Sequence, residues 1–212
     1  MSVKLYQCLA LLLIISQLGC YPKGAEYVEE LDLVYTNYMK DYDFKGNTTY
    51  AIPDSVIVIT GDNVIDPDGD GKPEILSSKY STVILAQLNQ NLAAYGWTRV
   101  PKTANPDVLI LPSTMTTTNI YYYYDWWYWD WWYGGWYGWY YPGYYPPYIT
   151  GYRSGSVFVQ MVQKDGIGQG ENLPVVWHGI LNGLAEGSSA NISARIQNGI
   201  NKAFSQSPYL KH

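Results

Sequence analysis

The feature that most constrains the fold is a run of tyrosine and tryptophan at residues 121–148. It reads YYYYDWWYWDWWYGGWYGWYYPGYYPPY, and 19 of its 28 residues are Tyr or Trp. The glycines and prolines spread through the run argue against one long helix. A segment of this length with so little regular pattern is unusual inside a compact domain and is often functional. We therefore expect a loop that is inserted between two strands of a small scaffold.

The aromatic run has three interpretations, which the sequence leaves open. Tyr and Trp prefer the boundary between water and lipid, so the run would orient a protein beside a membrane. The same residues dominate binding sites, so the run would bind a protein or glycan partner. Alternatively, it folds over the sheet or takes no fixed structure. The candidate interaction residues are its seven tryptophans: Trp126, Trp127, Trp129, Trp131, Trp132, Trp136 and Trp139.

The N-terminus has the pattern of a secretory signal. It reads MSVKLYQCLALLLIISQLGC, with a positive charge at Lys4 and an apolar run over Leu9–Ile15. This apolar stretch is shorter than the roughly 20 residues that span a bilayer. We expect residues 1–19 to be a signal peptide.

Cys20 is the expected site of lipid attachment. Gly19-Cys20 resembles the end of a bacterial lipobox, although Gln17 stands where Leu is usual. The alternative is an ordinary signal peptide with an incidental cysteine. Acyl chains on Cys20 would anchor the protein to the membrane, and residues 20–30 would form a lipidated tether. Tyr21, which follows Cys20, resembles an outer-membrane sorting signal.

The remaining chain, residues 31–212, is predicted to form a single α+β domain. Apolar residues with a helical period predict helices over Leu76–Tyr95 and Ile192–Phe204. Pro53 indicates an edge strand or a break in the second strand. Because most strands follow one another directly, we expect a mostly antiparallel sheet with both helices on one face. Alternating or β-rich patterns predict strands within residues 31–36, 48–60, 97–100, 107–120, 152–165 and 173–186.

Charge and motif content exclude some functions. The net charge is −5 and basic residues form no patch, which argues against nucleic-acid binding. His178 is the one histidine before the terminal residue, and no catalytic motif surrounds it. We therefore do not expect an enzyme. The alternative is a periplasm-facing hydrolase or sugar-binding enzyme, which would need a pocket of converging acids near His178.

The acidic loop DPDGDGKPE is a candidate for a weak calcium site, and no other cofactor is expected. Asp66, Asp68 and Asp70 match the first, third and fifth positions of a calcium loop, and Glu74 falls at the ninth. The twelfth position, where a bidentate Glu belongs, is Ser77. The alternative is a polar turn with acids near the start of the following helix.

The order of several short stretches resembles domain-of-unknown-function family 4136, a group of bacterial envelope lipoproteins. The stretches are GC at residues 19–20, VYTNYMKDYDF, TYAIPDSV, NLAAYGWTRV, NPDVLIL, VVWHGILNG and INKAFSQSPYL. The resemblance covers nearly all of the chain after the signal and implies a location and a fold. It carries over no functional residue.

Together these observations predict a non-enzymatic, lipid-anchored protein of the cell envelope, at the outer membrane. Its expected partners are the membrane, through the anchor at Cys20, and a protein or glycan that contacts the aromatic run.

Overall fold

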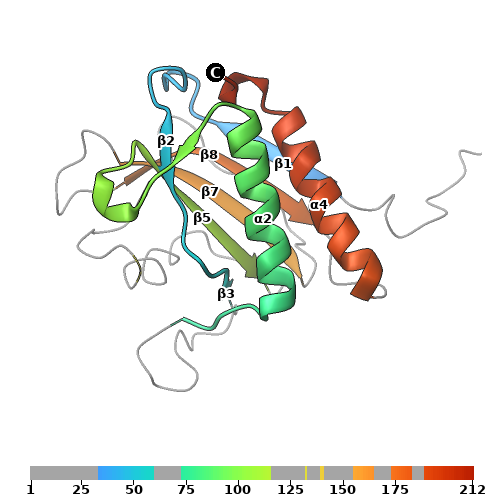
Figure 1. The fold of residues 1–212 in the computed structure, drawn as a ribbon. Helices are drawn as coiled ribbons and strands as arrows, with labels where there is room; N and C mark the ends of the chain where they lie inside the picture. Colours follow the sequence, from blue (N-terminus) through green and yellow to red (C-terminus); the bar gives the residue numbers. More distant parts are fainter. Residues whose placement is uncertain are drawn as a thin grey trace, which may run out of the picture. The chain divides into compact units, whose positions relative to one another are not determined.

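The computed structural model describes residues 33–59, 73–115, 132, 139–140, 155–164, 173–182 and 189–212. Within these residues, the α-helices α2 and α4 accompany the strands (Figure 1). The helices are α2 (Ser78–Ala94) and α4 (Ser189–Ser205), with short 3-10 helices η2 (Lys102–Ala104) and η3 (Pro208–Leu210). The strands are β1 (Leu33–Tyr38), β2 (Thr49–Ala51), β3 (Ile57–Ile59), β4 (Thr98–Arg99), β5 (Val108–Met115), β6 (Trp139–Tyr140), β7 (Ser156–Gln163) and β8 (Leu173–Asn182).

The sheet has the strand order β1-β8-β7-β5-β2-β4, and β3 also pairs with β5. The pairs β1–β8, β8–β7 and β7–β5 are antiparallel. Strands β2 and β3 are parallel to β5, and β4 is parallel to β2. The fold is therefore α+β, as predicted, with a mixed sheet.

The prediction of a mostly antiparallel sheet is wrong. It followed from counting strands that come directly after one another, which usually pair antiparallel. Helix α2, however, lies between β3 and β4 in the chain. A helical crossover of this kind returns the chain in its original direction and produces parallel pairing. This crossover makes the β2, β3 and β4 side of the sheet parallel.

Pro53 marks a break, as predicted. Strand β2 ends at Ala51 and β3 begins at Ile57, and both strands pair with the same neighbour. Tyr50 pairs with Val108 near one end of β5, and Ile57 pairs with Ser113 near the other. One segment therefore follows β5 for most of its length with an interruption at the proline, which has no N–H to donate.

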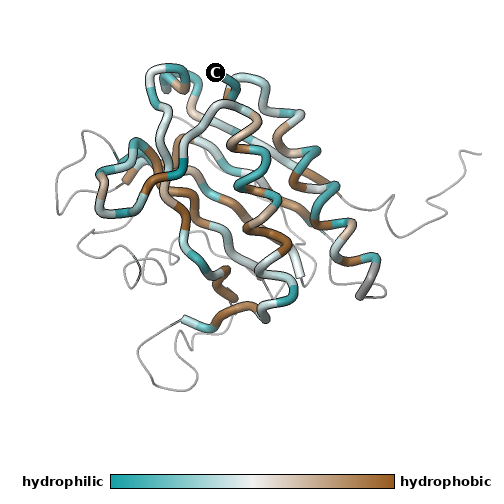
Figure 2. The backbone as a smooth tube through the Cα atoms, viewed as in Figure 1, coloured by the Kyte–Doolittle hydropathy of each residue, from teal (hydrophilic) through white to brown (hydrophobic). Residues whose placement is uncertain are grey.

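Both helices lie on one face of the sheet, as predicted (Figure 1). The four-residue spacing in α4 directs Ile196, Ile200 and Phe204 into the core, and Leu88 and Leu92 of α2 join them. The colour alternates between brown and teal along both helices in Figure 2, as expected of helices with one buried face. We call this side of the sheet the helix face.

Residues 207–212 close the helix face. The indole Nε1 of Trp97 donates to the carbonyl oxygen of Leu210 at 2.8 Å, and that of Trp177 donates to Ser207 Oγ at 2.9 Å. The ring of Tyr209 stacks on that of Tyr38 with centroids 3.8 Å apart. Buried indole N–H groups need acceptors, and this segment supplies both.

The other side of the sheet, which we call the second face, is also buried. Leu109, Leu111, Phe158 and Ile180 belong to a cluster of buried apolar residues there, and Trp132 packs against it. Neither α2 nor α4 covers this face, because both lie on the opposite side. The sheet therefore has an apolar core on each side.

Helix α2 begins and ends slightly inside its predicted range. It ends before Gly96, whose φ of +93° is a conformation that glycine adopts without strain. A Cβ at Gly96 would lie 2.9 Å from the Cβ of His212, so the site also requires a close approach. Within the described ranges, no helix combines the length and the apolar character needed to cross a membrane.

Candidate functional site

A row of polar side chains crosses the second face. Asn37 of β1 pairs with His178 of β8, and His178 pairs with Gln160 of β7. Direct cross-strand partners point to the same side of a sheet, so the three side chains share one face. His178 is 0% exposed and Gln160 is 1% exposed. The row is a group of polar side chains on a largely apolar face.

The surroundings of His178 keep its imidazole neutral. The ring of Tyr35 stacks on it with centroids 5.8 Å apart, and the Phe158 ring lies at 5.9 Å. Burial lowers the pKa of His178 to about 3. A group with this pKa accepts a proton poorly at neutral pH, where a general base needs a pKa near the working pH. Its cross-strand partners are the amides of Asn37 and Gln160 rather than acids.

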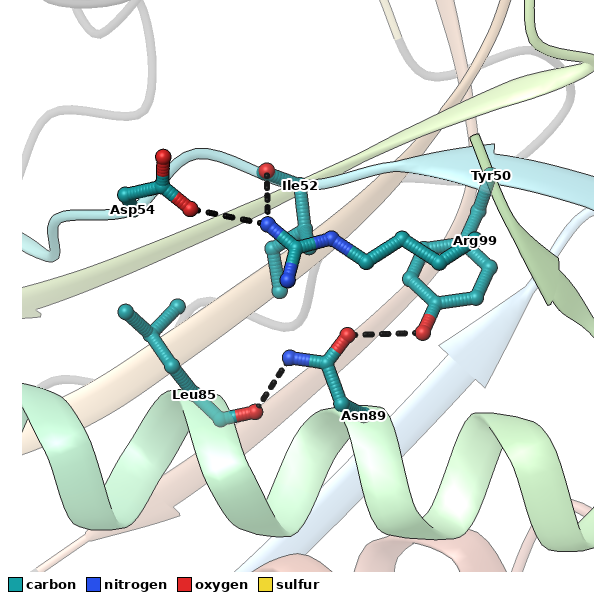
Figure 3. Close-up of polar contacts among 6 residues, drawn as sticks. All are labelled: Tyr50, Ile52, Asp54, Leu85, Asn89 and Arg99. Atoms are coloured by element: carbon teal, nitrogen blue, oxygen red, sulfur yellow. Dashed lines mark hydrogen bonds and ion pairs between the residues drawn. The ribbon is translucent and has the colours of Figure 1, made fainter. Parts of the chain in front are cut away.

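A second polar cluster lies where β2, β4 and α2 meet (Figure 3). Arg99 Nη2 lies 2.8 Å from Asp54 Oδ1 and donates to the Ile52 carbonyl oxygen at 3.3 Å. Because these side chains are 47% and 94% exposed, the ion pair contributes little stability. The Tyr50 hydroxyl donates to Asn89 Oδ1 at 2.7 Å. These contacts join β4 and α2 to the segment around the Pro53 break, which is a structural role.

Asp107, in the stretch NPDVLIL, holds the start of β2 beside the start of β5. Its Oδ2 accepts hydrogen bonds from the N–H groups of Thr48 and Thr49 and from the Thr49 hydroxyl, each at 2.8 Å. Burial acts to raise the pKa of Asp107, but the hydrogen bonds from Thr49 and Thr48 outweigh it, and the pKa is lowered. The carboxylate therefore acts as a cap for backbone donors.

Most predicted site residues lie outside the described ranges. Glu74 is described, and its side chain is exposed while its carbonyl oxygen accepts from the N–H of Val58 at 2.8 Å. Among the residues that the structure describes, no three His, Cys, Asp or Glu side chains are grouped to hold a metal ion. The predicted residues outside the described ranges are Cys20, Asp66, Asp68, Asp70, Trp126, Trp127, Trp129, Trp131 and Trp136.

The aromatic run meets the sheet at two described places. Trp132 packs against the second-face cluster, and Lys102 contacts it twice. Lys102 Nζ donates to the Trp132 carbonyl oxygen and also lies 5.6 Å from the centroid of its ring. The backbone of Trp139–Tyr140 pairs with Leu173 and Pro174 at the start of β8. Lys102 has no signal in the sequence that would have identified it.

The stretches that carry the family resemblance meet in the core of the helix face. Tyr38 and Phe44 come from VYTNYMKDYDF, and their rings lie 3.8 Å and 5.4 Å from that of Tyr209 in INKAFSQSPYL. Trp97 comes from NLAAYGWTRV and Trp177 from VVWHGILNG, and both hydrogen-bond to residues 207–210. These residues have packing roles, so the resemblance reflects the fold.

Comparison with known proteins agrees with this reading. The family described as Domain of unknown function (DUF4136) matches residues 34–209. A crystal structure of a protein of that family from Bacteroides thetaiotaomicron is 33% identical, with a TM-score of 0.66, over 85% of this chain and 97% of that one. A PDZ domain protein from Parabacteroides distasonis is 17% identical with a TM-score of 0.44, over 85% of this chain and 37% of that one. Comparison with curated proteins gave no match.

Proposed function

We propose a function from this chain's own residues, because the chain belongs to the DUF4136 family, which is described as a domain of unknown function. The protein is a non-enzymatic, lipid-anchored component of the cell envelope, at the outer membrane, and its aromatic run is an interaction surface for a protein or a glycan. The observation that carries the proposal is the position of the run. Met115 and Ser156 pair directly, so a two-residue turn would connect their strands, yet residues 116–155 stand between them.

The state of His178 supports a non-enzymatic role. The alternative enzyme needs a proton-transferring group near this residue. The imidazole is buried, its pKa is about 3, and it is flanked by the rings of Tyr35 and Phe158. Such a residue is typical of a packed core position and not of a general acid or base at neutral pH.

The lipid anchor is supported by the sequence around Gly19-Cys20. Residues 21–32 separate Cys20 from the start of β1 at Leu33. A fully extended chain of this length reaches about 40 Å. A tether of this reach lets the domain stand beside the membrane and contact partners close to its surface.

Metabolic labelling with a clickable fatty acid tests the anchor. We expect the native protein to carry the label, Cys20→Ala to lose it, and Cys8→Ala to keep it, because Cys8 lies within the signal peptide. Label on neither the native protein nor Cys8→Ala would refute lipid attachment. Label that persists in Cys20→Ala would assign the anchor to another residue.

Binding to isolated cell-wall glycan tests the interaction surface. The purified full-length protein and a variant with Trp126→Ala, Trp127→Ala and Trp129→Ala are compared by co-sedimentation. Since truncating a hot-spot aromatic residue costs about 2 kcal/mol or more, one hot spot among these three tryptophans would make the variant bind at least about 10-fold more weakly. Equal binding by both proteins would contradict a glycan role for the run. Glycan cleavage that His178→Gln abolishes would instead favour the enzyme.

A further inference from the structure

The aromatic run leaves the sheet and returns to it at the same end. Met115 ends β5 and Ser156 begins β7, and these two residues are direct cross-strand partners. At the opposite end of the same strand pair, Val108 pairs with Gln163. The two ends of the inserted segment are therefore neighbours at what we call the Met115 end of the sheet.

Both described contacts of the run lie at the other end. Lys102, which holds Trp132, belongs to η2, shortly before β5 begins at Val108. Trp139–Tyr140 pairs with Leu173 and Pro174, which directly precede Val175, and Val175 pairs with Val162 near the end of β7. Trp132 and Trp139–Tyr140 are thus held far from Met115 and Ser156, the two strand ends that the inserted segment connects.

Strand geometry gives the length of this crossing. Strands β5 and β7 have 8 residues each. At about 3.3 Å per residue, the Met115 end and the opposite end are roughly 25 Å apart. The chain crosses this length once between Met115 and Trp132 and again between Tyr140 and Ser156. Fully extended, each of these two segments could span about twice this distance.

The second face provides a reason for the crossing. It contains buried residues from β2, β3, β5, β7 and β8, while both helices cover the other side. Contiguous apolar patches of several hundred square ångströms are rarely left in water. Trp132 packs on this cluster, which shows that the run reaches it.

We propose that the second face is the docking surface for the chain's own aromatic run, residues 121–148. The run is held at the far end by Lys102 on Trp132 and by the pairing of β6 with β8. This inference does not depend on the anchor at Cys20 or on any partner. A partner that binds the run does so without displacing Trp132 from the second face.

The lysine contact allows a matched test by amide hydrogen exchange on the full-length protein. Lys79 also lies near an aromatic ring, 5.4 Å from the centroid of Tyr80, but on the helix side. We expect Lys102→Ala to speed exchange at Trp139–Tyr140 and Leu173 by at least about 10-fold, while Lys79→Ala leaves these amides unchanged. Equal exchange in the two variants, or unprotected Trp139–Tyr140 amides in the native protein, would overturn the proposal.

Shortening the run gives a second, independent test. Residues 116–155 are replaced by Asn-Gly, which forms a two-residue hairpin turn between Met115 and Ser156. We expect the shortened protein to bind a hydrophobic dye several-fold more strongly, or to fail to fold, because its second face is uncovered. A shortened protein that folds with native dye binding would refute the inference. Loss of Trp139–Tyr140 protection in the native protein on adding anionic phospholipid vesicles would show that the membrane takes the run instead.

Discussion

The two faces of the sheet are both buried, but they are built differently. The helix face is covered by α2 and α4, and its polar groups, such as the indoles of Trp97 and Trp177, have hydrogen-bond partners in residues 207–210. The second face has no described helix and carries the row Asn37, His178 and Gln160 among its apolar residues. The described residues thus include a helical layer on one side of the sheet and a polar row within an apolar cluster on the other.

The stretches that carry the family resemblance contribute to both faces. They place Tyr38, Trp97, Trp177 and Tyr209 on the helix face, and Leu109, Leu111 and Ile180 on the second face. The aromatic run touches the second face, at Trp132. Both faces therefore maintain the fold, and the run adds its contacts to the second face.

The largest expected effect compares one phenylalanine on each face. Phe204 belongs to the helix face and Phe158 to the second face, and both are almost fully buried. We expect Phe204→Ala and Phe158→Ala each to lower the free energy of unfolding by about 3–5 kcal/mol, because each leaves a cavity in a packed core. Urea unfolding measures both. A cost below about 1 kcal/mol for Phe158→Ala would show that the second face is not a dry core.

An intermediate effect distinguishes the faces by their response to acid. The pKa of His178 is about 3 in the folded protein and 6.5 in the unfolded chain. Between these values the unfolded state binds a proton that the folded state does not, so stability falls as the pH falls. From pH 7 to 5 this linkage amounts to about 2 kcal/mol.

The variant His178→Gln isolates this contribution, because glutamine does not titrate. Urea unfolding at several pH values should give a shallower loss of stability for the variant than for the native protein below pH 6.5. If the free energy of unfolding depended on pH equally in the variant and the native protein, His178 would be solvated or have a charged partner.

The smallest expected effect concerns a hydrogen bond on the helix face. Ser207→Ala removes the acceptor of the buried Trp177 indole N–H and should cost about 1–2 kcal/mol, independent of pH. The control is Ser205→Ala, because the Ser205 hydroxyl donates to the Lys202 carbonyl oxygen at an exposed position. Thermal unfolding compares the two variants. Equal melting temperatures would show that the indole finds another acceptor.

Periodicity predicted the elements of this fold better than their pairing. The spacing of Ile196, Ile200 and Phe204 identified α4 and its buried side, alternation identified β7, and a β-rich stretch identified β8. The parallel part of the sheet was missed because alternation describes one strand at a time. Pairing depends on the path of the chain between strands, which here passes through α2.

The polar residues show a second limit of sequence reasoning. Ser207 and Leu210 are buried against Trp177 and Trp97, which lie far away in the chain, so no local pattern predicts their burial. His178 is likewise buried by its neighbours in space, Tyr35 and Phe158. Such environments come from tertiary packing. The predicted anchor and calcium loop, by contrast, are local patterns and remain predictions.

The hydrogen bonds that close the helix face affect when, during synthesis, this face can finish folding. Trp97 and Leu210 are 113 residues apart, so their hydrogen bond joins an early and a late part of the chain. During synthesis, the core around Trp97 stays incomplete until residues 207–210 have been added. Contacts over such distances slow folding. The helix face therefore reaches its final packing only after this late segment is present.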